Sequence, residues 1–124
     1  MAERQPYSST APLTAPTPKI FLHHWKKAVQ KIGPSYFSGK GINPDQITHW
    51  RQLTPCVKVL HKAVTEKPTS TAAFIACVVG FYNAEEGERM QRKVGCNGIG
   101  KLIDAMNQYQ RDIVATLILS KQEW

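Results

Sequence analysis

The sequence has no apolar run of the roughly 18 residues that a membrane-spanning helix requires. Its first 18 residues also lack the apolar stretch of a secretory signal peptide. The three cysteines, Cys56, Cys77 and Cys96, include no C-x-x-C pair, and their odd number argues against a disulfide framework or a zinc knuckle. We therefore expect a cytoplasmic protein that has no membrane contact and no structural metal.

Strand patterns, in which β-branched residues alternate with polar ones, are missing too, and apolar residues recur at helical spacing instead. The length of 124 residues suits one domain. We predict an all-α fold, a compact bundle of four to five helices spanning residues 19–124. Residues 1–18 hold four of the eight prolines together with several Ser and Thr, which predicts a flexible tail.

Acidic residues are scarce in one part of the chain. Residues 19–67 contain nine Lys or Arg against two acidic residues, whereas residues 68–124 are neutral, so the first segment carries the whole net charge of +7. All four histidines also lie in this basic half. Such segregation is typical of a surface that binds a polyanion. The alternative is a solvated basic surface that only keeps the protein in solution.

Start and stop signals along the chain predict where the individual helices lie. Apolar spacing and the Gly33-Pro34 stop predict a first helix over residues 19–32. Cap-then-proline signals predict helices over residues 44–53 and from residue 55 to about 67. Residues 72–82 are apolar nearly all round, which indicates a central buried helix that becomes charged beyond Tyr82. A last helix is expected over residues 98–123, with one apolar stripe formed by Ile99, Leu102, Ile103, Met106, Tyr109, Ile113 and Leu117.

The segment "SYFSGKGINPDQITHWRQ", Ser35 to Gln52, resembles the helix-turn-helix of small phage-type repressors and activators. The resemblance places Gly41 in the turn and puts Ile47 and Trp50 on the inner face of a recognition helix. Phe37 and Lys40 depart from the family's pattern, which wants a small and an apolar residue there. The resemblance implies that the polar face reads base edges or phosphates. The alternative is an ordinary helical hairpin with Trp50 in the core.

The stretch "GCNGIGK", Gly95 to Lys101, matches the first positions of the phosphate-binding P-loop. Leu102 stands where that loop has the hydroxyl residue that holds Mg²⁺, and no strand pattern precedes it. We interpret the stretch as a glycine-rich corner in which Gly95 ends one helix and Asn97 caps the next. Lys101, at a helix start, is kept as a candidate phosphate contact.

No catalytic constellation is visible, so we predict a protein that is not an enzyme and has no cofactor. The histidines lack metal-ligand spacing. The pairs Glu85–Arg89 and Glu88–Arg92 have the favoured i, i+4 order of a solvated helix face. Cys56 and Cys77, which stand among apolar residues, are expected in the core, and Cys96 nearer the surface.

The leading hypothesis is a small nucleic-acid-binding protein, with DNA or RNA as its partner. The candidate binding residues are Lys26, Lys27, Lys31, Lys40, Gln46, Thr48, His49, Arg51, Lys58, Lys62 and Lys101. The alternative is a helical structural subunit or adaptor of a ribonucleoprotein, conjugation or phage assembly. The apolar run from Val114 to Leu119 would then contact a protein partner or a second copy of the chain.

Overall fold

The computed structural model describes residues 18–39 and 41–121. Within these ranges the chain forms six α-helices and several 3-10 turns, and its only β-structure is an isolated antiparallel bridge between Phe37 and Pro55. The predicted all-α class is therefore confirmed, although the described residues contain six helices where four to five were expected. The predicted tail lies outside the described residues except for Pro18.

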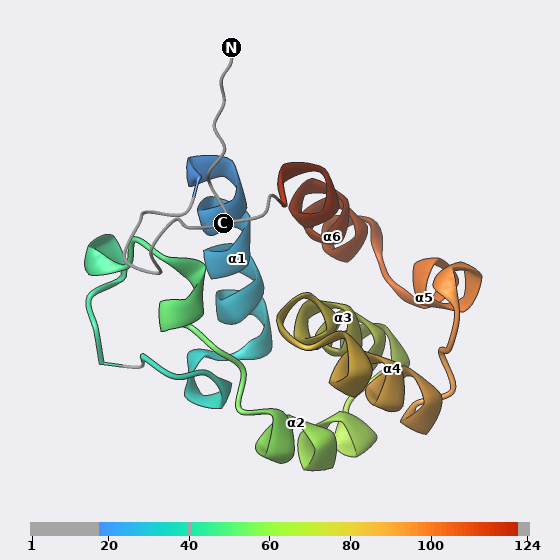
Figure 1. Cartoon of the computed structure of the whole chain (residues 1–124). Helices are drawn as coiled ribbons and strands as arrows, with labels where there is room; N and C mark the ends of the chain where they lie inside the picture. Colours follow the sequence, from blue (N-terminus) through green and yellow to red (C-terminus); the bar gives the residue numbers. More distant parts are fainter. Residues whose placement is uncertain (1–17, 40, 122–124) are drawn as a thin grey trace.

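The helices differ in length and in position. They are α1 (Lys19–Ile32), α2 (Val57–Ala63), α3 (Thr69–Tyr82), α4 (Ala84–Lys93), α5 (Ile99–Ala105) and α6 (Gln108–Ser120). The 3-10 turns are Pro34–Tyr36, Pro44–Gln46, Trp50–Gln52 and Val64–Glu66. Figure 1 shows α3 in the centre of the molecule, with the other helices around it. The most extensive contacts are those of α3 with α4 and of α1 with α6.

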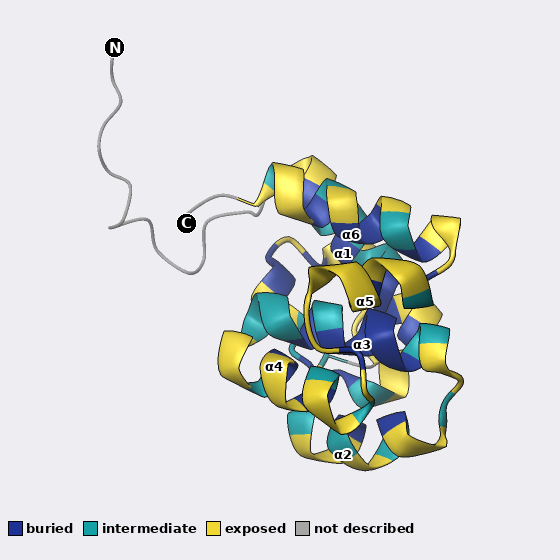
Figure 2. Cartoon of the chain, turned by 90° about the vertical axis from the view of Figure 1, so that its right-hand side faces the viewer, coloured by how far each residue is buried: buried dark blue, intermediate teal, exposed yellow. Residues whose placement is uncertain are grey.

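Helix α3 forms the core, as the sequence predicts. Seven of its residues are buried, including Phe74, Ile75 and Val78. Helix α1 has the predicted bounds and buries one stripe, Phe21, Trp25, Ala28, Val29 and Ile32, so its lysines lie on the opposite side. Figure 2 shows the same division around the molecule: buried residues gather at α3, and exposed ones cover the outer faces of α2, α4, α5 and α6.

The expected continuous helix over residues 44–53 is wrong. Two separate 3-10 turns, Pro44–Gln46 and Trp50–Gln52, occupy this segment, with extended backbone between them. The reason is competition from side chains. The Gln52 side-chain oxygen accepts hydrogen bonds from the backbone N–H groups of Thr48 (2.8 Å) and His49 (2.9 Å). The His49 ring in turn accepts one from the Arg51 N–H. Such local bonds stabilise a turn at the expense of a helix.

Two expected long helices are each divided by an asparagine. Asn83 ends α3 in an extended conformation, and its side chain then accepts a hydrogen bond from the Glu86 N–H, which starts α4. Asn107 separates α5 from α6 and forms a reciprocal capping box with Gln110. Capping of this kind is typically worth about 1 kcal/mol. The chain therefore reverses at Asn83, and α4 folds back onto α3 instead of leaving the core.

Three further expectations need correction. The helix expected from residue 55 begins only at Val57, because Pro55 pairs with Phe37, and it tightens to a 3-10 turn at Val64. Cys56 is exposed and Cys96 is buried, the reverse of what was expected. The expected single last helix is wrong, because α5 and α6 are separate. Of its expected apolar stripe, four residues are buried and three are exposed: buried Leu102, Met106, Ile113 and Leu117, and exposed Ile99, Ile103 and Tyr109.

A cluster of aromatic rings joins α1 to the following segment. The Trp25 and Trp50 rings meet edge to face with centroids 4.9 Å apart, and Phe21 contacts Trp50 at 5.6 Å. The Trp25 indole N–H donates a hydrogen bond to the carbonyl oxygen of Leu53 at 3.0 Å. Each ring pair contributes roughly 0.5–1.5 kcal/mol beyond its buried area. The cluster thus fixes the irregular 41–53 segment against one side of α1.

Candidate nucleic-acid interface

A groove with a volume of about 350 Å³ runs along the outer side of α1. We call it the basic groove. Its lining combines basic, amide and aromatic groups: His23, Lys26, Lys27, Gln30, Lys31, Pro44 and Tyr109. None of these described lining residues is acidic. The groove therefore presents hydrogen-bond donors and positive charge along two turns of one helix.

Helical spacing explains why the lysines gather there. In α1, Lys27 and Lys31 are four residues apart and therefore lie on one face, and His23 precedes them on that face by one more turn. The other wall comes from α6, which packs on α1. Tyr109, in the first turn of α6, is 48% exposed, and the Lys31 ammonium lies 5.2 Å from its ring centroid. The tyrosine holds this lysine beside the groove by a cation–π contact.

Lys26 is anchored where the helix meets the next segment. Its ammonium donates a hydrogen bond of 2.7 Å to the carbonyl oxygen of Pro44. An ammonium group has three donors, so two remain for a ligand. The same bond places the Pro44–Gln46 turn at the rim of the groove. In this turn Gln46 is exposed, and Thr48 follows it as another exposed residue.

The other predicted basic residues do not line the groove. Arg51 stacks on the rings of Trp50 and Tyr82, with its guanidinium carbon 4.7 Å and 5.6 Å from the ring centroids. Lys58 and Lys62 are exposed on α2, and Lys101 is exposed on α5, which Figure 1 shows well away from α1. Lys40 lies outside the described residues. Of the predicted basic residues that the structure describes, only Lys26, Lys27 and Lys31 therefore line the groove.

His49, expected to read bases, has a structural role instead. The side chain is only 5% exposed, and its Nδ1 accepts the Arg51 N–H at 3.1 Å as the cap of the Trp50–Gln52 turn. Burial, with a smaller contribution from the Arg51 charge, lowers the pKa of His49 below its ordinary value of 6.5. The lowered pKa favours the neutral ring, which caps the turn and does not line the basic groove.

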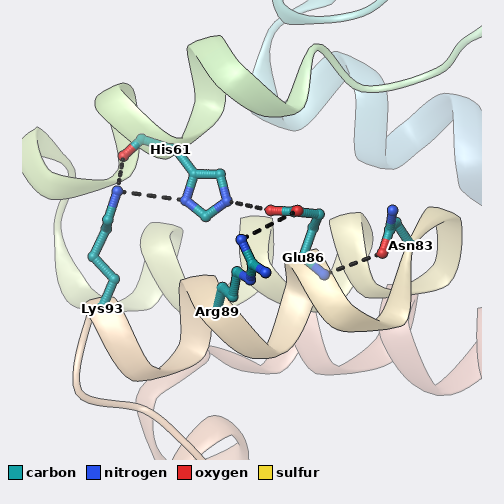
Figure 3. Close-up of polar contacts among 5 residues, drawn as sticks. All are labelled: His61, Asn83, Glu86, Arg89 and Lys93. Carbon is teal, nitrogen blue, oxygen red and sulfur yellow. Dashed lines mark hydrogen bonds and ion pairs between the residues drawn. The ribbon is translucent and has the colours of Figure 1, made fainter.

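A second polar cluster joins α2 to α4 (Figure 3). The His61 Nε2 lies 2.8 Å from a carboxylate oxygen of Glu86, whose other oxygen lies 3.8 Å from Arg89. On the other side of the ring, the Lys93 ammonium lies 3.4 Å from Nδ1 and donates to the His61 carbonyl oxygen at 3.0 Å. Because an ammonium only donates, Nδ1 accepts and Nε2–H donates to Glu86. The side chains of His61, Glu86, Arg89 and Lys93 each have a partner within the cluster, which indicates a structural link between the two helices.

The sequence predicted different partners for these charges. It favoured Glu85–Arg89 and Glu88–Arg92, whereas the structure pairs Arg89 with Glu86, which also contacts His61. The reason is that the fold brings α2 against the Glu86 face of α4, which spacing within one helix does not reveal. No group of three or more possible metal ligands occurs among the described residues. No helix in the described ranges is long and apolar enough to cross a membrane.

The glycine-rich stretch forms a corner between α4 and α5. Gly95 and Gly98 adopt positive φ angles of 76° and 100°, which other residues rarely adopt. The predicted cap at Asn97 is wrong, because Gly98 precedes α5 and no side chain caps that helix. Helix α5 has only seven residues. The Lys93 ammonium is already bound to His61. The glycine-rich stretch is therefore best described as the turn that joins α4 to α5.

The described residues form a small all-α fold with a cationic groove along α1. Comparison of the chain with protein-family models, with curated proteins and with solved structures finds no significant match. Its function must therefore be argued from the groove and the surfaces described above.

Proposed function

We propose that the chain binds nucleic acid through the basic groove of α1 and does so without catalysis. The observation that carries the proposal is the composition of the groove, in which three lysines and a histidine meet an amide and an aromatic ring with no acidic group among the described lining residues. Phosphates bind such donors and release condensed counterions as they do so.

The proposal uses α1 and not the segment Ser35–Gln52. That segment contains two short turns where the helix-turn-helix resemblance implies a continuous recognition helix. Helix α1 has 14 residues, its inner stripe is locked in the core, and its lysines project from a rigid element. A rigid support is what a phosphate-binding face requires, because less side-chain and backbone freedom is lost on binding.

The test compares two double variants with the same change of charge. Lys27→Glu with Lys31→Glu alters the basic groove, whereas Lys58→Glu with Lys62→Glu alters exposed lysines of α2. Labelled DNA and RNA are titrated at several salt concentrations. We expect the groove variant to bind every sequence more weakly, and its salt slope to fall by about one for each lost phosphate contact.

The α2 variant is the matched control for net charge. It should keep the wild-type salt slope, because its lysines do not line the groove. Equal weakening by both variants would show that net charge, and not the groove, causes binding. If the wild-type protein binds neither DNA nor RNA at low salt, the proposal is wrong. Circular dichroism of each variant establishes that the helices are retained.

A second candidate function, that of an assembly subunit, is favoured by exposed apolar residues at the end of α6. Val114 and Leu117 are buried, but Ile118 is exposed, and Leu119 is 85% exposed. Leu119 lines a hollow together with the exposed Ile20 of α1. Contiguous exposed apolar groups commonly mark a protein contact. The run from Val114 to Leu119 thus divides into a core face and an outer face, and only the outer face is available to a partner.

Sedimentation at increasing protein concentration tests whether a second copy of the chain is that partner. Association that Leu119→Lys abolishes and that Val59→Lys leaves unchanged would support the assembly role, since Val59 is an exposed residue of α2. A monomer at every concentration, with unchanged mass in both variants, would argue against self-association.

A further inference from the structure

An apolar pocket adjoins the basic groove. Its volume is about 240 Å³, and it shares Lys26, Gln30 and Pro44 with the groove. We call it the side pocket. Its remaining walls come from the inner edge of α1 and from the 34–53 segment, and the main apolar residues are Val29, Ile42, Ile47 and Leu53. A hydrophobic hollow therefore opens next to a row of phosphate-binding groups.

The side pocket is formed by fixed parts of the molecule. Val29 and Ile47 are buried, and the Ile47 N–H bonds to the Pro44 carbonyl oxygen, so this wall is held in place. The Ile42 N–H donates to the Gly39 carbonyl oxygen at 3.0 Å, which closes the turn at the rim. Ile42 itself is 43% exposed and forms the edge that a ligand would cross. These bonds and buried side chains thus hold part of the described wall in place.

Building on the proposed function, we propose that the protein binds single-stranded nucleic acid and that the side pocket takes one unstacked base. The phosphates of the strand lie along Lys27 and Lys31 in the basic groove, and Lys26 stands at the junction of groove and pocket. The exposed amide of Gln30 also lies at this junction, where it can hydrogen-bond to the edge of a base. The proposal thus gives the phosphate and the base of one nucleotide a recognition element each.

Charge and size together select this ligand. A purely apolar ligand would make no use of the positive charge of the groove, and a phosphate alone would leave the side pocket empty. The volume of about 240 Å³ is below the ~300–1,000 Å³ of sites for drug-sized molecules, which favours a single ring system. A duplex would first have to unpair and unstack a base, whereas a single strand offers its bases freely. A single strand therefore satisfies both surfaces at the lowest cost.

The experiment uses the full chain and three probes of equal length: a short single-stranded DNA, the same strand with abasic sites in its centre, and the matching duplex. The abasic strand keeps every phosphate, so its salt slope should equal that of the parent strand. Its affinity should be about tenfold lower, because it has no ring to bury in the pocket. The duplex should also bind more weakly than the parent strand.

Two variants locate the effect. Ile42→Ser removes apolar surface at the pocket rim and should weaken binding of the parent strand about fivefold while leaving the abasic strand unaffected. Val59→Ser, at an exposed position of α2 outside the pocket, should change neither. Ile42 is partly exposed, so its replacement preserves the core.

The outcomes separate this inference from the proposed function. Equal binding of parent and abasic strands, or an Ile42→Ser variant that binds both as the wild type does, would overturn the base pocket and leave the basic groove standing. Tighter binding of the duplex would also overturn it. If neither the three DNA probes nor an RNA strand of the same sequence binds at low salt, the proposed function itself fails.

Discussion

Replacing Gly87 by alanine tests the tightest helix contact in the molecule. Helices α3 and α4 cross where Gly80 faces Gly87. A Cβ atom at Gly87 would lie 2.5 Å from the Gly80 Cα, 2.8 Å from the Gly80 nitrogen and 3.0 Å from the carbonyl oxygen of Ala76. All three neighbours are backbone atoms, so no side-chain rotation relieves the overlap and the two helices must separate.

The net effect is the difference of two terms. Overpacking of a close contact costs about 1–3 kcal/mol, and the rigid backbone neighbours at Gly87 favour the upper end. Alanine gains about 1 kcal/mol in helix propensity over glycine. We therefore expect Gly87→Ala to lower the free energy of unfolding by about 2 kcal/mol. For a chain of this size that corresponds to a fall in Tm of roughly 8 °C.

Gly80→Ala is the matched control. A Cβ at Gly80 would lie 3.9 Å from the Gly87 Cα, which is ordinary van der Waals contact, so the propensity gain should dominate. Its Tm should rise by up to about 4 °C. Thermal unfolding followed by circular dichroism measures both variants. A Gly87→Ala protein as stable as the wild type, or the same loss of stability in both variants, would refute the described crossing.

Three further changes have definite expected outcomes. Because burial and the Arg51 charge depress the pKa of His49 in the fold, the free energy of unfolding should fall as pH drops through about 6.5. Urea denaturation at several pH values should show a smaller pH dependence in His49→Asn, and an unchanged dependence would contradict the assignment. Iodoacetamide should modify the exposed Cys56 before Cys77, whose pKa burial raises to about 11, and mass spectrometry reads the order. Asn107→Ala should cost about 1 kcal/mol in thermal unfolding, and no loss would argue against the capping box.

The sequence predicts a helix correctly where its apolar spacing, its end signals and its polar face all agree. Helix α1 has apolar spacing, a Gly33-Pro34 stop and a basic outer face, and its bounds are as predicted. The two missed breaks also had a local signal. Asn83 is followed three residues later by Glu86, and Asn107 by Gln110, which is the spacing of a helix start. Apolar periodicity continues across both asparagines and favours longer helices, although the caps determine where the chain turns.

The 44–53 segment shows where local rules fail. Proline, an acidic first turn and apolar spacing all favour a helix there, yet His49 and Gln52 bond to nearby backbone N–H groups and produce two turns. The two turns depend on several side-chain-to-backbone hydrogen bonds that form together, so no single residue in the sequence indicates them. The same arrangement buries His49, which on sequence grounds was an ordinary polar residue of a recognition helix.

The candidate site combines residues that the sequence predicts with residues that only the fold brings together. Lys26, Lys27 and Lys31 were predictable from charge and helical spacing. Tyr109 was not, because it is 78 residues from Lys31 in the sequence and comes beside it only when α6 packs on α1. The side pocket was equally hidden, since its walls depend on the non-helical path of the 41–53 segment.

Helix α1 links the stability of the fold to the proposed binding surface. Its inner stripe places Phe21 and Trp25 in the aromatic cluster, and its outer side carries the basic groove. The cluster also holds the 41–53 segment through the bond from Trp25 to Leu53, and that segment forms the rim of the side pocket. We propose that net charge forms a binding surface only where packing orders it. The two exposed lysines of α2 have the same four-residue spacing as Lys27 and Lys31 but do not line the groove, and for this reason we propose α1 as the nucleic-acid-binding helix.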